Sequence, residues 1–190
     1  EGKRATIIFD CAMSHARVYI NGMEVGYWLY GYISFHFDIT PYLKVGEINT
    51  LAVRLENENE SSRWYPGAGI YRNVPLVVTE DTYVPVWGTQ LTTPTVTNEW
   101  AKVELRTKLV TPEGADKTIY RIVTDIVNPA GEVVATNEAT LSRYDNSLFE
   151  QSFDVANPEL WSVDRPALYY ANSKIYAGNE LKDEYSTRFG

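Results

Sequence analysis

The sequence is poor in the residues that stapled domains and metal sites require. It has one cysteine, Cys11, and two histidines, His15 and His36, in 190 residues. A single cysteine cannot form an intrachain disulfide, so the chain is not a disulfide-stapled domain. One cysteine and two separated histidines also cannot supply the ligand spacing of a zinc site. We therefore expect no metal and no other cofactor.

Long apolar runs and positive charge are scarce as well. No run approaches the roughly 18–20 apolar residues that a membrane-spanning helix needs, so no membrane partner is expected. The 17 Lys and Arg residues are outnumbered by 25 Asp and Glu residues, and the formal net charge is −8. Proteins that bind a phosphate backbone carry clustered Lys and Arg. A nucleic-acid partner is therefore not expected either.

Aromatic residues are abundant instead, at 13% of the chain with 14 Tyr and 5 Trp. Their rings combine a flat apolar face with a polar edge, which suits half-buried strands and also surfaces that stack against sugars. Most such rings lie in protein cores. The composition, 44% hydrophobic and 22% charged, is that of an ordinary folded protein.

The hydrophobic pattern alternates with a period of two, which predicts an all-β chain. Alternation is clear over residues 17–20, 34–39 and 50–55, and Asn21-Gly22 is a strong hairpin signal. His36 falls on the outward face of its segment. The apolar residues of the last two segments are expected to face inward: Phe35, Phe37, Ile39, Leu51, Val53 and Leu55.

The composition changes near residue 82, which suggests two domains, 1–82 and 83–190. Beyond this point aromatic residues thin out, and segments rich in Thr and Val alternate with turns containing Pro and Gly. Strands at this spacing indicate a seven-strand sandwich of the immunoglobulin type. The expected strands cover residues 84–91, 100–110, 119–127, 132–139, 147–155 and 169–176.

Residues 57–72 interrupt the alternating pattern. The stretch begins polar and becomes aromatic and glycine-rich. A long ordered loop of this composition is more often a binding or docking surface than a plain connection, and we favour the functional interpretation.

No catalytic set is recognisable. Neither histidine lies near a nucleophile-elbow pattern. A glycosidase needs two carboxylates that flank the scissile bond, and Glu56, Glu58 and Glu60 do recur at every second residue. However, nothing apolar surrounds them to separate their pKa values, as acid–base catalysis requires. We interpret them as a solvated acidic loop and assign no catalytic residue.

Five motifs occur in order along the chain: VYINGMEVG at 18–26, FDITPYLKVGE at 37–47, SRWYPGAGIYRNV at 62–74, LWSVDRPALY at 160–169 and STRFG at 186–190. Together they resemble glycoside hydrolase family 2, which includes β-galactosidases, β-glucuronidases and β-mannosidases. The segment SRWYPGAGIYRNV is most similar to the bacterial β-galactosidase branch.

The resemblance implies a partial galactose-binding-like jelly roll, 1–82, and an immunoglobulin-like sandwich, 83–190. It also implies an internal fragment, because family members begin with a longer jelly roll and continue into a (β/α)8 barrel that carries two catalytic glutamates. The chain would then be the non-catalytic accessory region of a retaining β-galactosidase-like hydrolase, inactive by itself. Alternatives are a β-glucuronidase or β-mannosidase parent, or a free-standing carbohydrate-binding module.

The resemblance also implies a substrate contact, because a jelly-roll loop of the family touches the sugar at the barrel mouth. The matching segment is 57–64, which gives Asn57, Arg63 and Trp64 as substrate-binding residues. Arg63 could donate hydrogen bonds to sugar hydroxyls or pair with a barrel carboxylate, and Trp64 could offer a stacking face. The alternative for Arg63 and Trp64 is packing between domains.

A jelly roll without its leading strands would expose unpaired strand edges. We therefore expect the isolated chain to self-associate through such edges. The cellular compartment stays open, with a bacterial periplasm or cell envelope as one option.

Overall fold

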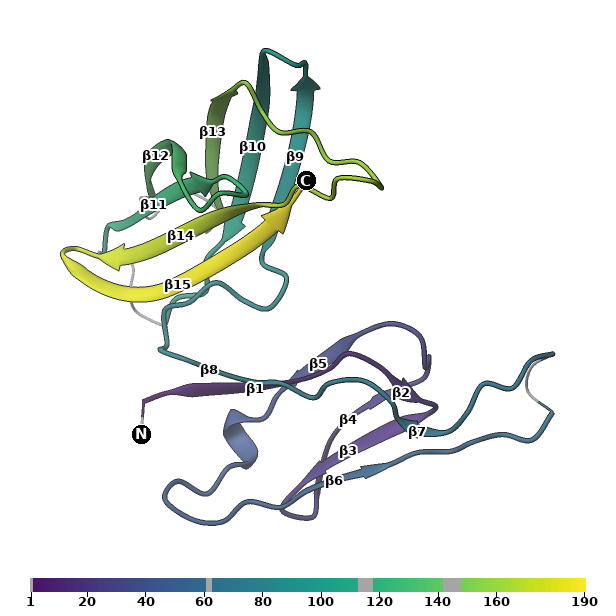
Figure 1. Ribbon diagram of the computed structural model, residues 1–190. Coiled ribbons are helices and arrows are strands. Elements are labelled where there is room, and N and C mark those ends of the chain that lie inside the picture. The colour runs from purple at the N-terminus through teal and green to yellow at the C-terminus, as the bar shows by residue number, and fades with distance from the viewer. Residues whose placement is uncertain (1, 61–62, 113–117, 142–147) are drawn as a thin grey trace. The chain divides into compact units, whose positions relative to one another are not determined.

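The computed structural model describes residues 2–60, 63–112, 118–141 and 148–190. The chain divides into two compact units, Glu1–Thr79 (unit 1) and Glu80–Gly190 (unit 2) (Figure 1). The division falls slightly before residue 82 because Thr82 is buried and Tyr83 bridges Val110 within unit 2. Both units are built from strands, which confirms the all-β class. The 3₁₀ turn Thr40–Tyr42 is too short to cross a membrane, and the described residues hold no longer helix.

Unit 1 is a jelly-roll-like sandwich whose described residues form two three-stranded antiparallel sheets. One sheet has the order β5-β1-β8 and the other β4-β3-β6, while β2 pairs with β7. Asn21 and Gly22 adopt positive φ angles of 52° and 84° between β3 and β4, as the predicted tight hairpin requires. The strands are β1 Arg4–Phe9, β2 Ala12–Met13, β3 Ala16–Ile20, β4 Met23–Trp28, β5 Phe35–Asp38, β6 Leu51–Arg54, β7 Gly69–Ile70 and β8 Leu76–Thr79.

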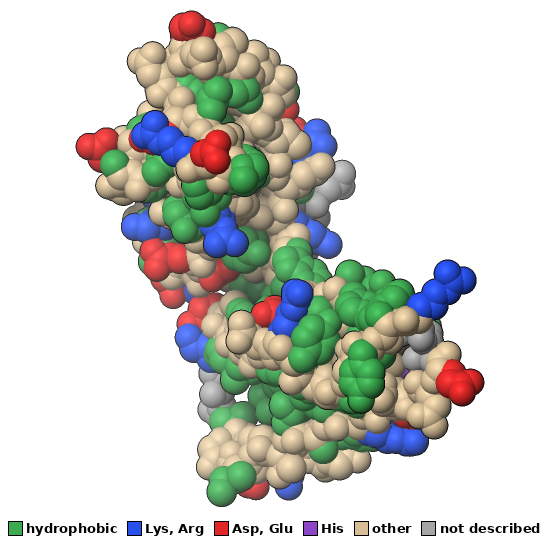
Figure 2. Space-filling view, turned by 45° about the vertical axis from the view of Figure 1, so that its right-hand side comes forward, with side chains coloured by type: hydrophobic (Ala, Val, Ile, Leu, Met, Phe, Trp, Pro, Cys, Tyr) green, Lys and Arg blue, Asp and Glu red, His purple; other side chains and the backbone are tan. Residues whose placement is uncertain are grey.

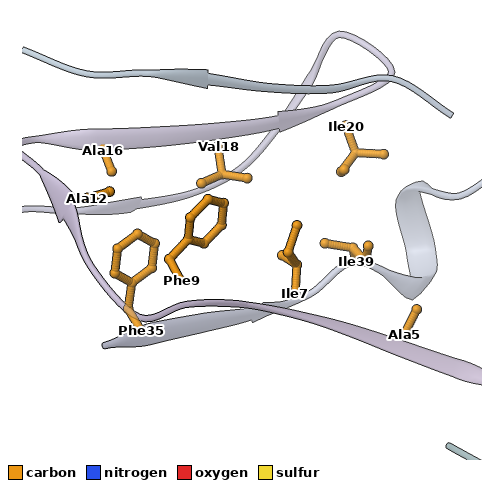
Figure 3. Packing of buried hydrophobic residues seen from close by; sticks show 9 residues of the cluster. All are labelled: Ala5, Ile7, Phe9, Ala12, Ala16, Val18, Ile20, Phe35 and Ile39. Carbon is orange, nitrogen blue, oxygen red and sulfur yellow. The ribbon is translucent and has the colours of Figure 1, made fainter. Parts of the chain in front are cut away.

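The two sheets of unit 1 meet in one core (Figure 3). Phe9 is fully buried and stacks on Phe35 with ring centroids 4.9 Å apart. Val18 lies opposite them on the other sheet. The predicted inward face of β5 is confirmed, because Phe35 is buried whereas His36 is exposed. The buried cluster consists of Ala5, Ile7, Phe9, Ala12, Ala16, Val18, Ile20, Phe35 and Ile39.

The sandwich of unit 1 is uncovered at its outer strands. Leu76 and Val78 of β8 pair with Ile7 and Ala5 of β1, so they share the core face, yet they are 58% and 56% exposed. Leu51 of β6 also faces inward as predicted and stays exposed. The cause is that β6 and β8 are the outermost strands of their sheets in the described chain.

Unit 2 is an immunoglobulin-like sandwich. Its described residues form a three-stranded sheet, β13-β10-β9, and a four-stranded sheet, β12-β11-β14-β15, all with antiparallel pairing. The strands are β9 Thr89–Val96, β10 Trp100–Lys108, β11 Tyr120–Val127, β12 Val133–Leu141, β13 Leu148–Ala156, β14 Tyr169–Ala177 and β15 Glu180–Phe189.

One strand prediction in unit 2 is wrong in part, and one strand was not predicted. Of the strand expected at residues 84–91 only the end from Thr89 onward forms, as the start of β9, because the chain turns before it. Trp87 has a positive φ of 57°, and the Gly88 amide donates to the Pro85 carbonyl at 2.7 Å. The strand β15 was missed because it is rich in polar residues and shows no strong apolar alternation.

A buried polar layer divides the core of unit 2. The core of unit 2 contains two clusters of buried apolar residues. Each of β10, β11, β13 and β14 carries one buried polar residue between the two clusters: Thr107, Thr124, Gln151 and Ser173. The Thr124 hydroxyl donates to Gln151 Oε1 at 2.8 Å and lies 2.8 Å from Ser173 Oγ. Gln151 in turn donates to the Asn137 carbonyl. This layer joins the two sheets through hydrogen bonds.

Candidate functional site

The segment between β6 and β7 extends away from the sheets of unit 1 (Figure 1). Its described residues, 55–60 and 63–68, form no helix or strand. Glu60 and Gly67 have positive φ angles of 57° and 69°, which turn the backbone away from extended geometry. Ser61 and Ser62, which belong to the predicted contact segment 57–64, lie outside the described residues.

Two of the three predicted substrate-binding residues line one hollow of about 350 Å³, here called the loop hollow. Asn57 and Trp64 lie on its wall, together with the carboxylate-bearing Glu58 and Glu60. Arg63 is exposed beside Trp64 but is not among the lining residues. The lining consists of Asn57, Glu58, Asn59, Glu60, Trp64, Tyr65, Pro66, Gly67 and Ala68.

A second hollow of about 360 Å³ shares Trp64 and Pro66 with the loop hollow and is called the tyrosine hollow. It is formed where β2 ends and where the chain passes from β4 to β5. Aromatic and aliphatic side chains make up most of its surface. The lining consists of Met13, Ser14, His15, Leu29, Tyr30, Gly31, Tyr32, Trp64 and Pro66.

Trp64 is oriented by a contact that the sequence did not reveal. Its indole Nε1 donates to the Tyr32 hydroxyl at 2.8 Å, and the two rings lie 6.5 Å apart. Tyr32 belongs to the β4–β5 connection. This connection is held in turn by Tyr71, whose hydroxyl donates to the Gly31 carbonyl at 2.8 Å. The pKa of Tyr71 is raised, first by a hydrogen bond with the Cys11 thiol and second by burial of the phenol.

The glutamates of the loop contact different partners. Glu56 forms an ion pair with Arg54 at 2.9 Å, and Glu58 Oε1 lies 3.7 Å from His15 Nε2. Glu58 and Glu60 are exposed. These positions agree with the interpretation of the segment as a solvated acidic loop. Among the described residues no group of three or more His, Cys, Asp or Glu side chains could hold a metal ion.

The arrangement brings a flat aromatic surface next to hydrogen-bonding groups. Trp64 presents an indole that is 63% exposed and lines both hollows, and amide and carboxylate groups border the loop hollow. Flat rings beside hydrogen-bonding groups match the apolar face and polar edge of a sugar.

Unit 1 and unit 2 each match a known domain. The model of the sugar-binding domain of glycosyl hydrolases family 2 matches residues 1–80, and the model described as glycosyl hydrolases family 2 matches residues 86–190. The β-galactosidase BoGH2A of Bacteroides ovatus is 39% identical over the whole chain, and a putative β-glucuronidase of Formosa agariphila is 36% identical over 99% of it.

The similarity extends to solved structures. A glycosyl hydrolase family 2 member from Bacteroides cellulosilyticus superposes on the whole chain with a TM-score of 0.92 at 33% identity. The chain spans 25% of that structure, 22% of the Bacteroides ovatus enzyme and 18% of the Formosa agariphila protein. Because the two domain models match nearly all of the chain in order, this protein belongs to glycosyl hydrolase family 2.

Proposed function

We propose that the chain is a non-catalytic accessory region of a β-galactosidase-like retaining glycosidase and shapes the entrance to its active site. The observation that supports this is the ordered match to the family's sugar-binding domain and second domain, over a chain that spans about a fifth of its relatives. The β-galactosidase identity of a 39% identical relative supports the sugar class. Hydrolysis of O-glycosyl bonds would then depend on groups supplied outside this chain.

Trp64 and Asn57 are proposed to contact the terminal sugar in the loop hollow. The indole ring would stack on the apolar face of the pyranose, and the Asn57 amide would exchange hydrogen bonds with its hydroxyls. Arg63 lies outside the lining of this hollow. It is therefore proposed to act from the rim, by donating to a sugar hydroxyl or by pairing with a carboxylate of the catalytic barrel.

A β-glucuronidase parent is the second candidate, because a putative β-glucuronidase is 36% identical over nearly the whole chain. The two candidates differ only in the sugar, and parallel assays of a galactoside and a glucuronide on the complete enzyme would separate them. A free-standing carbohydrate-binding module is the third possibility. It would bind sugar without any neighbouring catalytic domain.

We expect the purified chain to show no hydrolysis of 4-nitrophenyl β-galactoside, whereas the complete enzyme hydrolyses it. In the complete enzyme, Trp64→Ala should lower kcat/KM about tenfold through loss of ring stacking, and Trp64→Phe should retain most of it. Tyr170→Ala, at an exposed tyrosine of unit 2, is the matched control and should leave the rate unchanged. Hydrolysis by the chain alone would overturn the accessory role.

We also propose that the isolated chain self-associates through the uncovered face at β8. Leu76 and Val78 offer apolar side chains, the outer edge of β8 pairs with no strand of the described chain, and β8 itself carries no charged residue that would discourage pairing. Light scattering should give a mass above 21.6 kDa that rises with concentration. Val78→Lys should return the mass to that of the monomer, whereas Val133→Lys, at an equally exposed valine of unit 2, should not. A monomeric wild type at all concentrations would contradict this.

A further inference from the structure

The turn at Ser14 and His15, between β2 and β3, is fastened to two other segments of unit 1. The Glu56 amide donates to the Ser14 carbonyl at 2.9 Å, and the Ser14 hydroxyl donates to the Glu56 carbonyl at 2.9 Å. The His15 amide donates to the carbonyl of Leu29, which follows β4, at 3.1 Å. The turn is therefore a fixed point beside the base of the β6–β7 segment.

The hydrogen bonds of this turn also determine which nitrogen of His15 carries a hydrogen. The Ser14 hydroxyl has one hydrogen, and it is donated to Glu56. The hydroxyl must therefore accept in its 3.1 Å contact with His15 Nδ1, so Nδ1 carries a hydrogen. In the neutral ring Nε2 is then an acceptor, whereas in the protonated ring Nε2 also carries a hydrogen.

The Nε2 side of His15 faces the β6–β7 segment. Nε2 lies 3.7 Å from the Glu58 carboxylate, and in the described part of the chain this is the only ion pair or side-chain hydrogen bond made by residues 57–60. Two acceptors that face each other repel, so the neutral ring does not hold Glu58. The protonated ring attracts Glu58 and can donate to it.

Few other charges act on the His15 ring. Tyr27 of β4 lies 6.3 Å away, between ring centroids, and Arg17 of β3 covers the Tyr27 ring and pairs with Glu24. Glu56 pairs with an arginine of β6. The tyrosine hollow, which His15 lines, is mostly aromatic and aliphatic, and Figure 2 shows hydrophobic side chains exposed together on one face of unit 1. Glu58 is thus the carboxylate that a positive charge on His15 would attract.

We propose that His15 is a positioning residue that acts through Glu58 and depends on charge. The protonated ring holds Glu58, and with it the adjacent Asn57, on the wall of the loop hollow, whereas the neutral ring releases them. This rests on the proposed role of Asn57 in sugar binding and adds control of that site by pH. Histidine side chains change charge between about pH 5 and pH 8, so the wall is held in acid and released as the pH rises.

Proton NMR of the chain at about pH 5.5 and about pH 8 tests the proposal. We expect the nuclear Overhauser contact between the His15 ring and the Glu58 methylene groups to weaken about two- to fivefold at the higher pH, as suits an exposed ion pair. In Glu58→Gln the contact should be weak at both pH values. Glu60→Gln removes the same charge from the same segment without touching the pair, and it should keep the full pH response.

In the complete enzyme, Glu58→Gln should lower kcat/KM about two- to fivefold at about pH 5.5 and leave it unchanged at about pH 8. His15→Asn should do the same, since asparagine tolerates the positive φ of 49° at this position and carries no charge.

A contact of equal strength at the two pH values, or absent at both, would overturn the proposal. An equal loss of kcat/KM at both pH values in Glu58→Gln would also overturn it, because Glu58 would then act on the substrate directly. The NMR result does not depend on hydrolysis, and the Trp64→Ala assay does not depend on His15. The failure of this proposal is therefore distinguishable from the failure of the proposed function.

Discussion

The Phe9→Ala variant is expected to lose the folded state of unit 1 while unit 2 remains folded. Phe9 is fully buried, and its ring stacks on Phe35, which in turn stacks on Trp28 with centroids 5.6 Å apart. Truncation of a buried phenylalanine costs about 3–5 kcal/mol through lost transfer energy and the cavity that remains. A domain of this size has a total stability of only about 0.05–0.15 kcal/mol per residue. The loss is therefore comparable to the whole stability of unit 1.

Amide NMR spectra can follow the two units separately in this variant. The dispersed resonances of unit 1 should collapse, and those of unit 2 should persist, because each unit has its own buried clusters. The matched variant Phe153→Ala, at a buried phenylalanine of unit 2, should give the reverse pattern. Collapse of both units in either variant would show that the two do not fold independently.

The Thr124→Val and Thr107→Val variants are expected to affect unit 2 in opposite ways, although both threonines are fully buried. Valine at 124 removes the hydroxyl that contacts Gln151 and Ser173, and it leaves their polar atoms buried with one partner fewer. Each such group costs about 1–3 kcal/mol, so the two together should lower the free energy of unfolding by roughly 2–6 kcal/mol.

The hydroxyl of Thr107, by contrast, has no hydrogen-bond partner in the part of the chain that the structure describes. Replacing it with a methyl group removes a desolvation penalty, so Thr107→Val should change stability by less than about 1 kcal/mol, in the stabilising direction. Urea denaturation of both variants measures the difference. Equal midpoints would mean that the polar layer contributes nothing specific.

The alternation of apolar and polar residues predicted a strand and its inward face correctly wherever the strand has one buried face and one solvated face. In β5 the buried Phe35 and the exposed His36 follow directly from that pattern. The pattern failed for β15, which is a polar outermost strand, and for residues 84–91, where Pro85 and the turn at Trp87 prevent a continuous strand. In both cases the outcome depends on neighbours in space or on backbone turns that alternation does not encode.

The substrate-binding role of Asn57, Arg63 and Trp64 stays a prediction from the family resemblance of segment 57–64. The structure places Asn57 and Trp64 on the loop hollow. It does not place Arg63 there. Tyr30 and Tyr32 were missed, although a Tyr-Gly-Tyr sequence after a strand is a signal of exposed aromatic rings. Their importance lies in their proximity to Trp64, more than 30 positions further along the chain.

The order of residues was enough to establish an all-β chain with two modules, its family resemblance and the aromatic loop, because strand alternation, turn residues and motifs are local properties. The uncovered face at β8, the polar layer within unit 2 and the two hollows that share Trp64 emerged only in three dimensions. Each of them depends on which distant segments come together, and that is decided by packing of the whole core and not by any one stretch of sequence.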